Sequence, residues 1–175
     1  MTRIALCALA AAALAACSPA APTKAPPAAK PKHRAPAQLV AGPLPAPPAW
    51  ARRFMGKIID QMLPEKEVCV GNADRSLSRF TGSPAGSGVG GWAWDRQAKQ
   101  PVARVLLTDE TLRVWGAGEG GEERPDVPRH LPEASGRSGW QGAVTGTSGL
   151  VVAWGLVDDG RAICPLGELD LGETP

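Results

Sequence analysis

The sequence predicts an all-β domain at residues 65–170, as a small antiparallel β-sandwich or, as the alternative, a partly open β-barrel. Two observations predict it. Apolar runs of four to eight residues are separated by glycine, aspartate and asparagine, as in short strands joined by tight turns. In addition, 19 of the 21 glycines follow Pro64, whereas 10 of the 18 prolines lie between Ser18 and Ala49. A turn-rich domain therefore follows a proline-rich arm.

The charges divide at the same place. Residues 1–64 carry 8 basic and 1 acidic side chains, whereas residues 65–175 carry 11 basic and 16 acidic ones. The net charge of the whole chain is only +2, which excludes a strongly basic nucleic-acid binder.

Residues 1–16 have the pattern of an export signal. Arg3 supplies a positive charge, and the following 13 residues are all apolar. A helix of that length spans only ~20 Å, which is short of the ~30 Å hydrocarbon core of a membrane. The segment is therefore expected to direct export rather than to cross the membrane permanently.

The end of this segment, Leu14-Ala15-Ala16-Cys17, resembles the lipobox of bacterial lipoproteins. The resemblance implies that Cys17 becomes a lipidated N-terminus and that this covalent lipid attaches the protein to a membrane. No other cofactor is expected. Ordinary signal-peptide cleavage after Ala15 is the alternative. Ser18 in place of aspartate favours the periplasmic face of the outer membrane if the host is Gram-negative.

Residues 17–49 are expected to be a disordered tether. Proline and alanine occupy 20 of the 32 positions from 18 to 49, and no acidic residue is present. Polyproline II geometry at ~3.1 Å per residue gives a reach of up to ~100 Å. Its cations, Lys24, Lys30, Lys32 and Arg34, either contact anionic surfaces or serve solubility alone.

Residues 50–64 are expected to contain a short amphipathic helix over 50–63. Apolar side chains recur at every fourth position, and a proline ends the pattern: Trp50, Phe54, Ile58, Met62 and Pro64. The apolar face packs on the β-domain, lies in a membrane interface or binds a partner helix.

Seven strands are expected in the domain, at residues 68–71, 89–94, 102–108, 112–116, 139–144, 150–157 and 162–166. A two-residue loop at Asp109-Glu110 would pair Leu107 with Leu112 and would sort apolar from polar side chains on both strands. That register places Leu106, Thr108 and Trp115 on the outer face, with Arg104 opposite Trp115. Asp159-Gly160 fits a type I′ hairpin turn before the last strand.

Two cysteines remain in the domain after export and lipidation. Cys69 and Cys164 lie in the first and last expected strands, and the exported compartment is oxidising. A disulfide between them is therefore expected. Two cysteines without CxxC spacing do not make a zinc site, and no metal is expected.

Gly91-Trp92-Ala93-Trp94-Asp95, Arg124-Pro125-Asp126-Val127 and Gly139-Trp140 resemble the GWAxD...RPD type of β-sandwich module of exported and glycan-associated bacterial proteins. The resemblance covers about residues 88–165. It implies an envelope β-module of largely undefined role and carries no catalytic residues over to this chain.

The residues of these motifs are interpreted mainly as structural. Trp92 and Trp94 share one face of a strand, and the glycine before them permits close approach of another backbone or a bulge. Arg124 and Asp126 can form a charge-assisted pair that latches the loop, with ligand contact as the alternative. Asp95 belongs to the same motif, and Trp140 is expected in the core.

The candidate ligand site is Trp115 with Arg104 and Arg113. An exposed indole beside guanidinium groups can hold a sugar ring by its apolar face while the cations bind hydroxyls or carboxylates. The alternative is that a second layer or the helix at 50–63 covers this face.

Catalytic patterns are weak in this sequence. His130 is the one histidine of the domain, no GxSxG elbow is present, and the run from Gly116 to Gly121 is expected to be a flexible loop. We therefore expect a non-catalytic, lipid-anchored envelope protein that binds cell-wall or surface glycan. A scaffold for an envelope protein partner is the alternative, and a hydrolase is less favoured. Residues 171–175 are a short tail.

Overall fold

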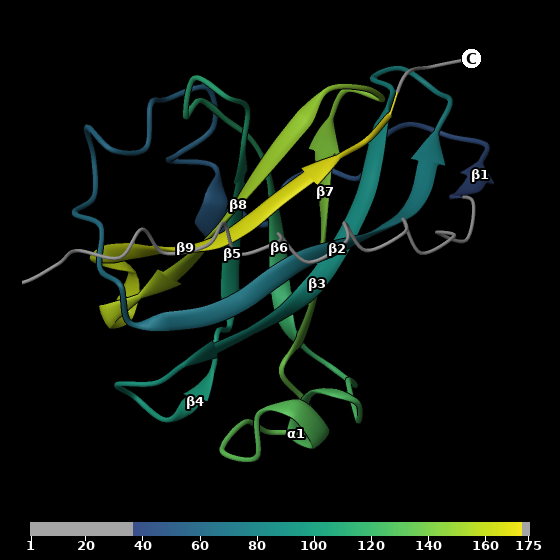
Figure 1. Cartoon of the computed structure of the whole chain (residues 1–175). Coiled ribbons are helices and arrows are strands. Elements are labelled where there is room, and N and C mark those ends of the chain that lie inside the picture. The colour runs from purple at the N-terminus through teal and green to yellow at the C-terminus, as the bar shows by residue number, and fades with distance from the viewer. Residues whose placement is uncertain (1–36, 173–175) are drawn as a thin grey trace, which may run out of the picture. The chain divides into compact units, whose positions relative to one another are not determined.

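The computed structural model describes residues 37–172, and within them the chain is all-β, as predicted (Figure 1). The predicted signal peptide, Cys17, the tether up to residue 36 and residues 173–175 lie outside the described residues. The elements are β1 (Gln38–Val40), η1 (Ala49–Ala51), β2 (Cys69–Phe80), β3 (Gly86–Asp95), β4 (Gln100–Pro101), β5 (Arg104–Thr108), β6 (Val114–Glu122), α1 (Val127–His130), β7 (Gly139–Thr145), β8 (Leu150–Val157), η2 (Asp158–Gly160) and β9 (Ala162–Asp170).

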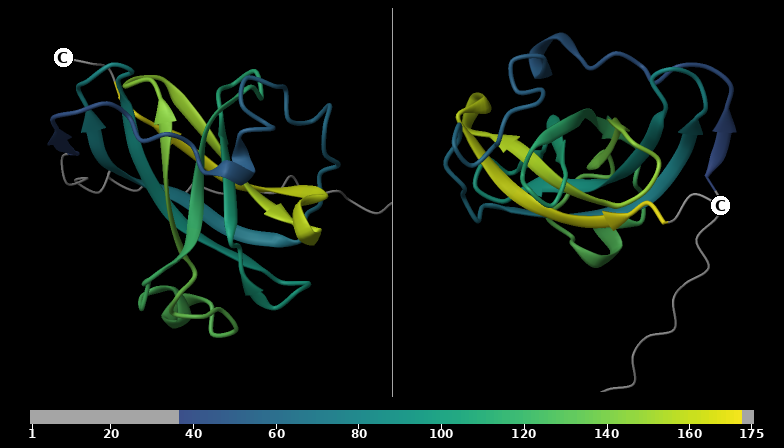
Figure 2. Two further views of the ribbon diagram at one scale, coloured as in Figure 1. Left: turned by 180° about the vertical axis from the view of Figure 1, so that it is seen from behind. Right: turned by 90° about the horizontal axis from the view of Figure 1, so that it is seen from above.

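The strands form one open sheet of nine strands, not the two separate sheets that a sandwich requires. Eight strands follow the order β1-β2-β3-β7-β6-β5-β8-β9, and β4 pairs with β3. Every pairing is antiparallel except that of β1 with β2. The sheet curls so that β9 packs against β2 (Figure 2), which brings it closer to the partly open barrel.

A disulfide joins β9, at one edge of the curled sheet, to β2, the strand next to the other edge. Cys69 at the start of β2 is bonded to Cys164 in β9, and their Cα atoms are 5.8 Å apart. The predicted disulfide is therefore confirmed. It links strands between which no ladder of hydrogen bonds is formed, since β2 pairs with β1 and β3 while β9 pairs with β8.

Both faces of the sheet are covered. The larger cluster fills the inside of the curl and includes Val89, Val105, Leu107, Trp140 and Leu169. A second cluster lies outside β5, β6 and β8, where the chain over 49–63 covers Leu106 and Trp154. None of the helices within residues 37–172 has the length and apolar composition needed to cross a membrane.

The amphipathic helix predicted over 50–63 is not formed. Only the short turn η1 is helical, and Gly56 has a φ of +74°, in the left-handed region. The Gly56 N–H donates to the Val114 carbonyl at 2.8 Å, and the Ile59 N–H donates to that of Leu112 at 3.0 Å. Two amides of the segment therefore bond to Val114, the first residue of β6, and to Leu112 just before it, while others bond within the segment. Its apolar side chains still pack on the domain, with Phe54 and Ile59 fully buried.

The register predicted for the first hairpin is wrong. Leu107 pairs with Gly116 instead of Leu112, and Arg104 pairs with Glu119 instead of Trp115. The loop is longer than two residues because Asp109 Oδ1 accepts the backbone N–H groups two and four residues further on. Leu106 and Thr108, expected at the surface, are fully buried, because the chain over 49–63 and Trp154 cover that face.

Several strands are longer than predicted. The run expected to be a flexible loop, from Gly116 to Gly121, lies within β6. A Cβ at Gly118 would lie 2.5 Å from the Gln141 carbonyl oxygen, so glycine allows β6 and β7 to approach closely. β2 extends to residue 80, and β1 and β4 were not expected. The last hairpin is confirmed by the pairing of Val157 with Ala162, although its loop has four residues.

Candidate functional site

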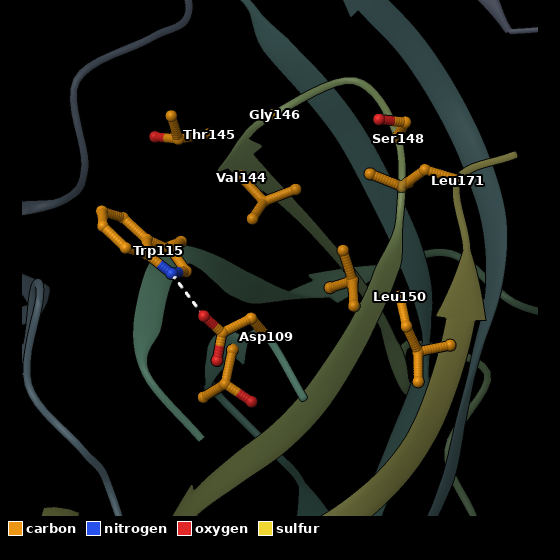
Figure 3. A pocket seen from close by; sticks show the side chains of 10 residues that line it. Asp109, Trp115, Val144, Thr145, Gly146, Ser148, Leu150 and Leu171 are labelled. Atoms are coloured by element: carbon orange, nitrogen blue, oxygen red, sulfur yellow. Dashed lines mark hydrogen bonds between the residues drawn. The ribbon is translucent and has the colours of Figure 1, made fainter. Parts of the chain in front are cut away.

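A cavity of about 310 Å³ lies where the β5–β6 loop, the β7–β8 loop and the end of β9 meet (Figure 3). These loops are at the end of the sheet opposite to α1 and β4 (Figure 1). Trp115 and Asp109 stand on one side of the cavity, and Ser148, Leu150 and Leu171 stand on the other. An apolar cavity with a few polar groups at its rim is the usual form of a small-ligand site.

Trp115 is the aromatic residue of this cavity and is 41% exposed. It lies in β6 at a bulge, because Leu107 pairs with Gly116 and Thr108 with Val114, and it does not belong to the outer cluster that residues 49–63 form. Its indole N–H donates to Asp109 Oδ2 at 2.8 Å (Figure 3). Because that polar group is already bonded, the exposed part of the ring offers carbon surface to a ligand.

Asp109 is a site residue that the sequence reasoning missed. Its Oδ1 accepts from the Thr111 N–H at 2.8 Å, the Thr111 hydroxyl at 2.7 Å and the Arg113 N–H at 3.0 Å. Partial burial raises the pKa of Asp109, whereas these bonds and the bond from Trp115 lower it. The hydrogen bonds together outweigh burial, so the pKa lies below its ordinary value. The signal was an aspartate two residues before a threonine, as in an Asx turn.

The far wall of the cavity depends on the loop between β7 and β8. Gly146 and Gly149 have φ values of +105° and +91°, which glycine adopts without steric cost. The Gly146 carbonyl accepts the Ser87 hydroxyl at 3.0 Å, and the Gly149 carbonyl accepts the Leu171 N–H at 3.0 Å. The loop is thereby bonded to β3 and to the residue that follows β9.

Arg104 and Arg113, predicted to join Trp115 in a ligand site, lie elsewhere. The Arg113 guanidinium donates to the Gly56 carbonyl at 2.6 Å and so helps to hold the segment over residues 49–63 against the sheet. The Arg104 guanidinium lies 5.5 Å from the centre of the Trp50 ring, a cation–π geometry on the outer face. Neither side chain lines the cavity. The longer β5–β6 loop is the reason, since it shifts the register on which the prediction relied.

The Arg124-Pro125-Asp126 motif forms a charged cluster near α1. Arg124 makes two parallel bonds of 2.8 Å to Asp126 and a further contact of 3.1 Å to Asp74 in β2. Chiefly through the hydrogen bonds from Arg124, the pKa of Asp126 falls to about 2. The same bonds raise the pKa of the Arg124 guanidinium. This arrangement ties the loop that contains α1 to the sheet and does not face the cavity.

The pKa of Asp126 predicts how acid affects this loop. Its folded-state pKa of about 2 lies below the ordinary 3.8, so the pair stabilises the fold above pH 3.8 and loses that effect between pH 3.8 and 2. Because the carboxylate is half exposed, we expect Asp126→Asn to cost ~1 kcal/mol or less at neutral pH. Chemical unfolding followed from neutral pH to pH 2 measures it. A difference between variant and wild type that persists at pH 2 would contradict this assignment.

The other motif residues have the following surroundings. Trp94 is buried beside α1, while Trp92 is partly buried in the same cluster. Asp95 is buried, and its Oδ1 accepts the N–H groups of the next turn, from Gln97 at 2.8 Å and Ala98 at 2.9 Å. Trp140 is completely buried inside the curl.

The potential catalytic and metal-binding groups are not assembled at the cavity. His130 is exposed at the end of α1 and does not line it. Among residues 37–172, no three histidine, cysteine, aspartate or glutamate side chains come together in a group able to hold a metal ion.

Comparisons of this chain with protein-family models, with curated proteins and with solved structures find no match.

Proposed function

We propose that this protein is a lipid-anchored component of the bacterial cell envelope that binds glycan, without catalysis, in the cavity beside Trp115. The lipobox-like sequence ending at Cys17 supports the anchor and the exported location. The observation that carries the binding function is the partly exposed Trp115 ring, held through its N–H by Asp109 at the edge of the cavity.

The chemistry of the cavity suits a sugar. A sugar ring has an apolar face of C–H groups and an edge of hydroxyl groups. The Trp115 ring supplies carbon surface for the first, while the Asp109 carboxylate and the hydroxyls of Thr145 and Ser148 supply partners for the second. Leu150 and Leu171 complete an apolar floor. Arg104 and Arg113 take no part in this proposal.

Binding of glycan by the full-length protein tests the proposal. We expect saturable co-sedimentation of the detergent-solubilised protein with purified cell wall or surface polysaccharide. Trp115→Ala should weaken it about 30-fold, because truncating an anchoring tryptophan typically costs ~2 kcal/mol or more. Met62→Ala is the matched control, since Met62 is 38% exposed and lies outside the cavity. Circular dichroism checks that each variant is folded.

A protein partner is the second candidate, and Leu39 favours it. This side chain is 72% exposed on β1, the strand at one edge of the sheet. An edge strand with an exposed apolar residue can accept a strand from another protein. If neither wild type nor variants bind glycan, crosslinking in the native envelope with Leu39→Asp as the comparison tests this candidate.

A further inference from the structure

The charge at the Trp115 cavity restricts which sugars fit it. Asp109 is the one acidic residue among the described residues that line the cavity, and none of them is lysine or arginine. The lowered pKa of Asp109 keeps its carboxylate ionised at mildly acidic pH. The cavity is therefore electronegative, although the chain as a whole carries a net charge of +2.

The carboxylate has room for one more hydrogen-bond donor. Each oxygen of an ionised carboxylate accepts about two hydrogen bonds through its lone pairs. Oδ1 of Asp109 already accepts three, from Thr111 and Arg113. Oδ2 accepts one, from Trp115, and so keeps a free acceptor position beside the indole ring.

Two arginines that contact residues of the cavity direct their guanidinium groups to backbone carbonyls. Arg113 directs its guanidinium to the Gly56 carbonyl, and Arg79 donates at 3.0 Å to the Leu171 carbonyl. Both guanidinium groups keep their positive charge, but neither donates a hydrogen bond to the Asp109 carboxylate. Within the β5–β6 loop, the exposed Glu110 adds a second negative charge next to Asp109 in the chain.

From this geometry we infer that the site selects sugars that carry a free, protonated amino group over N-acetylated sugars and over uronic acids. This inference rests on the proposed glycan-binding function. An ammonium group donates to Asp109 Oδ2 as a charge-assisted bond and gains cation–π attraction from the Trp115 ring. An N-acetyl group donates a weaker bond in which only the acceptor is charged, and a uronic acid places a second carboxylate near the first.

Titration calorimetry with three defined tetrasaccharides tests the inference on the full-length protein. The probes are tetramers of glucosamine, N-acetylglucosamine and galacturonic acid, at mildly acidic pH where Asp109 is ionised and the amine is protonated. We expect the glucosamine tetramer to bind about fivefold more tightly than the N-acetylated one, since a bond between two opposite charges gains about 1 kcal/mol over one with a single charged partner. The galacturonic acid tetramer should bind most weakly.

Two variants of the cavity rim separate charge from shape. Ser148→Lys introduces a cation opposite Asp109 without touching the turn that Asp109 holds, and it should remove the preference for the amine. Ser148→Gln is the matched neutral control: it removes the Ser148 hydroxyl, so all three tetramers should bind more weakly, but the preference for the amine should remain. Ser148 is exposed, so both variants are expected to fold.

The outcomes distinguish the inference from the proposed function. If the wild type binds the N-acetylated or acidic tetramer as tightly as the glucosamine tetramer, the inference is wrong and glycan binding stands. If no tetramer binds while co-sedimentation still depends on Trp115, the inference alone is again wrong. If that co-sedimentation also fails, both are wrong.

Discussion

Removing the disulfide should lower the free energy of unfolding of this protein by about 4–5 kcal/mol. The bond between Cys69 and Cys164 spans 95 residues of sequence, so the unfolded chain loses the entropy of closing a long loop. That amount is a large share of the 5–15 kcal/mol typical of a domain. Urea unfolding of a Cys69→Ala/Cys164→Ala double variant, followed by tryptophan fluorescence, measures the change.

Reductant supplies the control for this experiment. It should destabilise the wild type by a similar amount and leave the double variant unchanged. A loss below about 1 kcal/mol would show that the unfolded chain is already compact enough to bring the two cysteines together. The disulfide would then contribute little through loop closure.

Replacing Gly91 by alanine should cost more than ~3 kcal/mol, the upper end of ordinary overpacking. Gly91 pairs with Ala73 in β2 and with Trp140 in β7. An added Cβ would overlap the Asn72 carbonyl oxygen and would lie 2.9 Å from the Trp140 ring. Both neighbours belong to the folded sheet, and a backbone carbonyl cannot rotate away as a side chain can.

Gly136→Ala is the matched control for Gly91→Ala. No atom outside its immediate neighbours lies within 4 Å of a Cβ added at Gly136, and its φ is not positive. This variant should fold with almost unchanged stability. Soluble yield and thermal unfolding of both variants measure the effect, and equal stability of the two would show that β2 and β3 separate at little cost.

The close approach of the neighbouring strands at Gly91 could be predicted from the sequence. A glycine directly before Trp92 in an expected strand suggested a bulge or the close approach of another backbone, and the β2–β3 ladder has a bulge next to it, between Ala73 and Arg75. The disulfide could also be predicted from the sequence. Two cysteines in the first and last expected strands of a domain that is expected to be exported have few other partners.

The helix over 50–63 could not be rejected from local pattern. The four-residue spacing of apolar residues is real, and two of them, Phe54 and Ile59, are buried. What decides the conformation is a non-local partner: the amides of Gly56 and Ile59 bond to the start of β6, more than 50 residues further along the chain. Tertiary hydrogen bonds of this kind override helix propensity.

Of the candidate site, the sequence predicts the exposed Trp115 but not the residues that lie beside it. The exposure of Trp115 followed from its place in an expected strand, although the β5–β6 ladder has a bulge at this residue that the predicted register lacks. Its partner did not, because the side chain of Asp109 folds the loop and moves Arg104 opposite Glu119. The cavity is therefore lined by the Asp109 carboxylate and not by the guanidinium groups of Arg104 and Arg113 that were expected there.

Closing the sheet with a crosslink also determines how tension travels through the molecule. When the chain is pulled at its two ends, force entering at Cys69 passes through the sulfur atoms to Cys164. Residues 70–163 are bypassed, and with them strands β3 to β8 and every residue that lines the cavity except Leu171. At ~3.5 Å per residue, some 330 Å of chain is withheld from extension. After mechanical rupture of the parts outside the crosslink, the chain between the cysteines still bears no end-to-end load, and Trp115 and Asp109 lie within that stretch, whereas Leu171 does not.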